Sequence, residues 1–173
     1  MEAELSNDLD EKRIMKKGWL RSDSGQGFTL VELLVAITII GTLTAIAIPQ
    51  FNGYRAQQKV NLAINDLRTI DNKIQSYKLS NEVYPLALTD VPRLVNLIDP
   101  WGITYEYLKI EGADTPSKGK MRKDKNLVPI NSDFDLYSMG ADTKSATPLT
   151  SKNSQDDVVR ANDGRYYGLA STY

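Results

Sequence analysis

Carboxylates are the side chains in this sequence that are best suited to chemistry. The 173 residues include no histidine and no cysteine, which excludes Ser–His–Asp hydrolases, thiolate nucleophiles, disulfides and His- or Cys-ligated metals. Three carboxylate patterns remain: Glu32 inside an apolar run, Asp133 with Asp135, and an aspartate-rich stretch near the C-terminus. The 21 basic and 22 acidic residues give a net charge of −1, which disfavours nucleic acid as a partner.

The aspartate-rich stretch, residues 140–165, has the composition of a hard-cation site. Its acidic residues are Asp142, Asp156, Asp157 and Asp163. Ca²⁺ binds about six to eight oxygen atoms from carboxylates and carbonyls, so a long polar loop could fold around it. The spacing is not that of an EF-hand, however, and a solvated acidic loop explains the residues equally well.

The element that must position Glu32 is a predicted membrane helix. Residues 28–48 read FTLVELLVAITIIGTLTAIAI, 21 residues whose single charge is Glu32. A helix of that length spans about 31 Å, close to the thickness of a bilayer core. An ionised carboxylate there costs about 2.5–3.5 kcal/mol and needs a partner. The run itself offers no Lys or Arg.

Composition alone leaves three interpretations of this run open. It could be a signal peptide cut after the Ala45-Ile46-Ala47 match, a plain membrane anchor, or a precursor cut after Gly27. Basic residues before the run favour a cytoplasmic N-terminus and an exported C-terminal domain. The leader is expected to start at Met15, or to carry residues 1–14 as a dispensable extension.

The segment GFTLVELLVAITIIGTLTAIAIPQF, residues 27–51, resembles the N-terminal segment shared by type IV pilins and type II secretion pseudopilins. The resemblance implies that a prepilin peptidase/methyltransferase cleaves after Gly27 and N-methylates Phe28. It equates Glu32 with the assembly glutamate and Pro49 with a helix-interrupting proline. We expect Glu32 to pair with the α-amino group of Phe28 in a neighbouring copy, which would generate a helical filament. The alternative is a Glu32 side chain that snorkels to the headgroups.

Beyond Pro49 the pattern predicts an α+β domain. Apolar residues recur at steps of three and four from Val60 to Tyr77, which predicts an amphipathic helix with one buried stripe, and Asn81–Pro85 ends it. Pro49 is expected to kink or melt the helix. The predicted strands are 103–110, 127–130 and 134–139, and the predicted loops are 111–126 and 140–165. Residues 165–173 are either a final strand or a tail. A long helix on a small antiparallel sheet follows.

The predicted organisation has four parts. Residues 1–27 form the leader, 28–48 the transmembrane and assembly helix, 49–80 its periplasmic continuation and 81–173 the globular domain.

Three later stretches resemble the major pseudopilin group of type II secretion: DPWGITYEY (99–107), DFDLYSMGAD (133–142) and QDDVVRANDG (155–164). This resemblance implies a Ca²⁺ site. Its ligands would be the side chains of Asp142 and of Asp156 or Asp157, with the carbonyls of Met139 and Val158.

The implied function is a subunit of an inner-membrane-anchored periplasmic filament that drives protein export. The implied partners are further copies, minor pseudopilins, the processing peptidase and an inner-membrane assembly platform. A type IV pilin is the alternative, disfavoured by the lack of cysteine. An enzyme is not expected, because Asp133 and Asp135 are most simply two charges on a solvated strand face.

Overall fold

The computed structural model describes residues 27–95, 97–112 and 119–173. The chain divides between Ala47 and Ile48 into two compact units, each described here by itself. Residues 1–26 of the predicted leader, with Met15 and the basic residues, lie outside the described residues.

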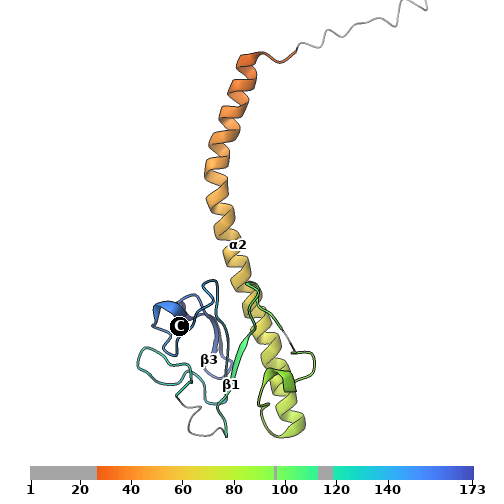
Figure 1. The fold of residues 1–173 in the computed structure, drawn as a ribbon, viewed down its shortest axis with the longest axis vertical. Coiled ribbons are helices and arrows are strands. Elements are labelled where there is room, and N and C mark those ends of the chain that lie inside the picture. The colour runs from red at the N-terminus through yellow and green to blue at the C-terminus, as the bar shows by residue number, and fades with distance from the viewer. Residues whose placement is uncertain (1–26, 96, 113–118) are drawn as a thin grey trace, which may run out of the picture. The chain divides into compact units, whose positions relative to one another are not determined.

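One helix, α2 (Leu30–Asn81), contains both the apolar run and the amphipathic stretch (Figure 1). Pro49 lies inside it with helical residues on both sides, so the predicted melting does not occur. A proline removes one backbone donor, and here that loss does not interrupt the helix. The helix ends where Glu82 turns to a φ of 63° and donates its N–H to the Lys78 carbonyl at 2.8 Å.

The C-terminal part of α2 carries the core of the globular unit. Its fully buried apolar residues are Ala63, Leu67, Ile70 and Ile74. Val60, Ile64 and Tyr77 pack against them at the edges of the stripe. The predicted buried stripe is therefore confirmed.

This stripe packs against a four-stranded antiparallel meander (Figure 1). The strands, in spatial order, are β1 (Glu106–Lys109), β2 (Phe134–Ser138), β3 (Val158–Ala161) and β4 (Tyr166–Leu169). Phe134, Leu136 and Val158 meet the helix, whereas Val159 and Ala161 face a second small cluster with Ile130 and Leu149. The α+β fold is as predicted.

Two strand assignments differ from the sequence prediction. Strand β3 lies inside 140–165, which was predicted to be loop. Residues 127–130 do not join the sheet, because Asp124 organises a turn whose Oδ1 accepts the N–H of Asn126 and Val128, both at 2.8 Å. The open question at the C-terminus is answered by β4 and a short 3₁₀ turn, Ala170–Thr172.

The aromatic residues of the 101–107 stretch belong to the core. Tyr105 is buried and donates its hydroxyl to Asp66 Oδ2 at 2.8 Å, and its burial raises the pKa of the phenol. Tyr107 and Trp101 are half-buried against the same cluster.

Candidate functional site

Glu32 has a local role that was missed from the sequence. Its carboxylate Oε2 accepts the backbone N–H of Thr29 at 2.9 Å and the Thr29 hydroxyl at 2.8 Å. In return, Thr29 Oγ1 accepts the N–H of Glu32 at 3.2 Å. This is the reciprocal capping box of a T-x-x-E sequence, which satisfies free N–H groups at the start of a helix. The cap holds Glu32 on the first turn of α2, close in sequence to Phe28.

The apolar run exposes its side chains in the isolated chain. The most apolar window of 18 residues has a mean hydropathy of 2.3, and none of it is buried. The helix is long and apolar enough to cross a membrane. Phe28 is 87% exposed and Leu30 81%. A continuous apolar surface of this size needs lipid or other protein to cover it.

The globular unit contains a buried ionic centre around Arg160, which is 1% exposed. Its guanidinium donates to both carboxylate oxygens of Asp133, at 2.6 and 2.8 Å, and to Asp71 Oδ2 at 3.0 Å. Burial by itself would lower the pKa of Arg160, but the hydrogen bonds and charges of Asp133 and Asp71 raise it overall. The Tyr167 hydroxyl also donates to Asp71, and burial together with this bond raises the Tyr167 pKa to about 12.

This centre corrects the sequence interpretation of several acidic residues. Asp133 and Asp135 were predicted to lie on a solvated strand face, but both are buried, as is Asp71 on α2. Asp135 accepts the N–H of Arg122 at 2.7 Å and the amide of Asn131 at 2.9 Å, and burial raises its pKa. Asp133 and Asp135 thus have separate partners and do not form a paired acid and base.

The predicted calcium ligands lie at both ends of the loop 140–157. Asp142 is exposed, and its Oδ1 accepts the N–H of Lys144 at 2.8 Å. Asp156 Oδ2 accepts the N–H groups of Ala141 at 2.8 Å and Asp142 at 2.9 Å. Asp157 is fully buried and pairs with the guanidinium of Arg122.

These side chains are bound by groups of the chain itself. Within residues 27–95, 97–112 and 119–173, no three Asp or Glu residues are grouped so that they could hold a metal ion. Met139 directly follows β2, and Val158 begins β3. A carboxylate that already faces a guanidinium is a poor ligand for a second cation. Calcium binding stays a prediction.

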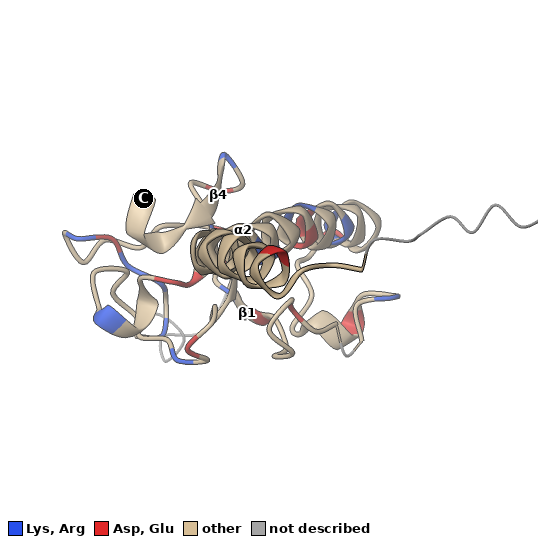
Figure 2. Cartoon of the chain, turned by 90° about the horizontal axis from the view of Figure 1, so that it is seen from above, with Lys and Arg blue, Asp and Glu red and all other residues tan. Residues whose placement is uncertain are grey.

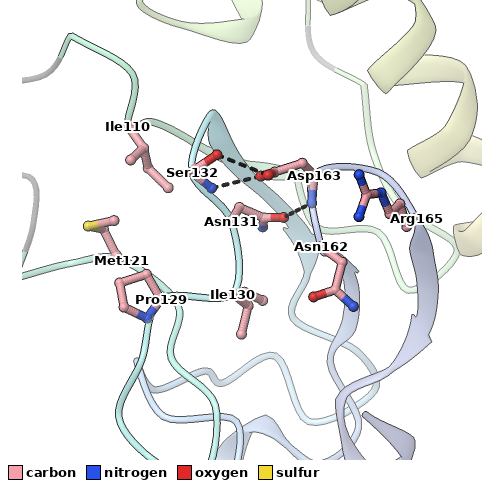
Figure 3. Close-up of a pocket in the computed structure, with 9 residues that line it drawn as sticks. All are labelled: Ile110, Met121, Pro129, Ile130, Asn131, Ser132, Asn162, Asp163 and Arg165. Atoms are coloured by element: carbon pink, nitrogen blue, oxygen red, sulfur yellow. Dashed lines mark hydrogen bonds between the residues drawn. The ribbon is translucent and has the colours of Figure 1, made fainter.

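Several polar groups that line a surface hollow in the globular unit bond to one another (Figure 3). On one wall, Ser132 donates its N–H and hydroxyl to the Asp163 carboxylate at 2.7 and 2.9 Å. The N–H of Asp163 donates to Asn131 at 3.0 Å, and Ile110 and Met121 form an apolar side. These bonds hold the turn before β4. Asp163 is therefore a turn residue.

Comparisons with known proteins identify the chain's relatives. The family model described as the prokaryotic N-terminal methylation motif matches residues 24–48. The type II secretion system core protein G of Pseudomonas aeruginosa is 32% identical over 138 residues, covering 68% of this chain and 84% of the relative. The chain belongs to the core protein G family.

Other members of the core protein G family align over similar lengths. The Aeromonas hydrophila protein is 28% identical over 141 residues, covering 70% of this chain and 86% of its own. The Klebsiella michiganensis protein is 32% identical over 121 residues, covering 70% and 79% respectively. No solved structure shows a significant match. These relatives favour the secretion-system interpretation over the type IV pilin. Each relative is named as a component of a secretion system, and none is named as an enzyme.

Basic and acidic residues both occur along the loops around the sheet (Figure 2). The net charge of −1 lacks the basic excess that is typical of nucleic-acid-binding proteins.

Proposed function

We propose that this chain is a structural subunit that polymerises into the periplasmic pseudopilus of a type II secretion system and so drives the export of folded proteins. Membership of the core protein G family supports this function, as does the methylation motif at residues 24–48. The observation that carries it is the exposed apolar surface of α2 within that motif. Lipid would cover this surface before assembly, and neighbouring subunits would cover it afterwards.

Assembly would depend on the pair formed by Glu32 and a new N-terminus. Cleavage after Gly27 creates an α-amino group on Phe28, and the Glu32 side chain of an adjacent subunit supplies the opposite charge. One such contact per subunit, repeated along an axis, produces a helical filament. The role is structural and not catalytic.

The proposed location and partners follow from this pathway. The precursor would be a single-pass inner-membrane protein with its C-terminal domain in the periplasm. Its partners would be further copies of itself, the prepilin peptidase/methyltransferase, minor pseudopilins and the inner-membrane assembly platform.

The first test is the N-terminus of the mature protein. We expect intact-mass and peptide mass spectrometry of the membrane-extracted protein from its native host to show a chain that begins at N-methylated Phe28. A Gly27→Leu variant should remain at precursor mass, because a bulky side chain replaces the residue at the cleaved bond. A mature chain beginning at Ile48 would indicate a signal peptide and would contradict the proposal.

A further inference from the structure

The Arg122 guanidinium binds two parts of the loop 140–157, residues 145–146 and its last residue, Asp157. Arg122 is 3% exposed. Nη2 donates to Asp157 Oδ2, and Nη1 donates to the Ser145 hydroxyl and, at 2.6 Å, to the Ala146 carbonyl. The Ser145 hydroxyl in turn donates to Asp157 Oδ2 at 2.6 Å. A carboxylate, a hydroxyl and a carbonyl are the kinds of oxygen donor that a calcium ion collects from a loop.

The charge of Asp157 requires a partner at this place. Asp157 is 0% exposed, and an isolated buried carboxylate is strongly unfavourable. Among the described residues, the single ion pair found for it is that with Arg122. One positive charge of the kind that a loop-bound cation would supply is therefore already present beside Asp157 Oδ2, whereas Asp157 Oδ1 is buried without a hydrogen-bond partner.

Arg122 is itself held in position by its surroundings. Its guanidinium carbon lies 4.3 Å from the centroid of the Tyr137 ring, and its backbone N–H donates to Asp135 at 2.7 Å. The next residue, Lys123, bonds the loop through its backbone, with Thr147 at 2.9 Å and Leu149 at 2.8 Å. Because Lys123 pairs with the loop through its backbone, the chain itself fixes the position of Arg122 beside the loop, and no bound ion is needed for this.

The two ends of the loop also meet through their backbones. Gly140 has a φ of 68°, and a Cβ atom there would lie 2.2 Å from the Asp156 carbonyl oxygen. The Asp156 side chain bonds the N–H groups that follow Gly140. Leu149, within the loop, covers the outer face of β3 by packing against Val159 and Ala161. Loss of loop order would therefore expose this second cluster.

We propose that the Arg122 guanidinium takes the place of a calcium ion in this protein, closing the loop 140–157 over the outer face of the sheet. The loop then keeps its order without a divalent cation. The resemblance to pseudopilins implies a bound calcium ion, and this proposal departs from it. It also goes beyond the proposed function, because it concerns whether the folded domain requires a metal ion.

The test compares loop protection with and without calcium in the full-length protein in detergent. Limited proteolysis, with mass spectrometry to locate the cuts, reports on 140–157, and thermal unfolding reports on the whole domain. For the wild-type protein we expect the same cleavage rate and melting temperature in calcium as in EGTA. Faster cleavage of the loop and a lower melting temperature in EGTA would overturn the proposal without any variant.

Substitutions then assign the effect to the arginine. Arg122→Ala should be cut within 140–157 at least about tenfold faster than wild type, because Asp157 is left buried and uncompensated. Arg165→Ala, which removes an exposed arginine, is the matched control and should not change the rate. Arg122→Ala with Asp157→Asn should recover part of the protection, because the uncompensated charge is gone. Wild-type protection in Arg122→Ala would refute the role of the guanidinium.

Discussion

Replacement of Glu32 by glutamine is expected to leave the precursor processed and membrane-inserted but unable to form filaments. The glutamine carbonyl can still accept the bonds from Thr29, so the helix cap is kept. The variant has no negative charge to pair with the α-ammonium group of Phe28 in the adjacent subunit. Loss of one partner of a desolvated ion pair costs about 3–5 kcal/mol, which would weaken each subunit contact more than about a hundredfold.

Filament yield by electron microscopy measures this effect, with mass spectrometry of the N-terminus to confirm processing. The matched control is Thr29→Val, which removes the hydroxyl of the cap but keeps the Glu32 charge. Its cost is that of a lost cap, about 0.5–2 kcal/mol, and it should still assemble. Normal filaments from Glu32→Gln, or equal failure of both variants, would show that the charge pair is not the assembly contact.

Replacement of Arg160 by methionine is expected to destabilise the globular unit by about 3–5 kcal/mol. The variant leaves Asp71 and Asp133 buried without their counter-charge, and it removes the bond to the Phe134 carbonyl at 3.1 Å. Because this arginine joins α2 to β2 from its place on β3, the loss should lower the melting temperature by roughly 10–20 °C.

Thermal and chemical unfolding of the full-length protein in detergent measure the change. Arg165→Ala serves again as the exposed control and should unfold like wild type. A triple variant, Arg160→Met with Asp71→Asn and Asp133→Asn, should be more stable than Arg160→Met, since no uncompensated charge remains. If the single and triple variants are equally unstable, lost packing and not the buried charge accounts for the effect.

Local patterns in the sequence were sufficient for the elements at the N-terminus and for the core stripe. The apolar run after Gly27 and the three-four spacing from Val60 to Tyr77 each depend on residues within a few helical turns. Strands 103–110 and 134–139 were found for the same reason, because β-branched and aromatic residues are concentrated there. The T-x-x-E cap was also readable from Thr29 and Glu32, although it was not recognised.

The state of the charged residues depends on contacts between distant parts of the chain. Asp71 and Arg160 are separated by 89 positions, and Arg122 and Asp157 by 35. Whether an aspartate is solvated, paired or free for a metal depends on which distant residue the fold brings to it. Strand β3 was missed for this same reason: its Arg160 reads as solvent-facing until the two aspartates that neutralise it are in place. Local sequence patterns were therefore enough to predict the helix, its processing motif and the fold class, whereas long-range pairing set which charges are buried.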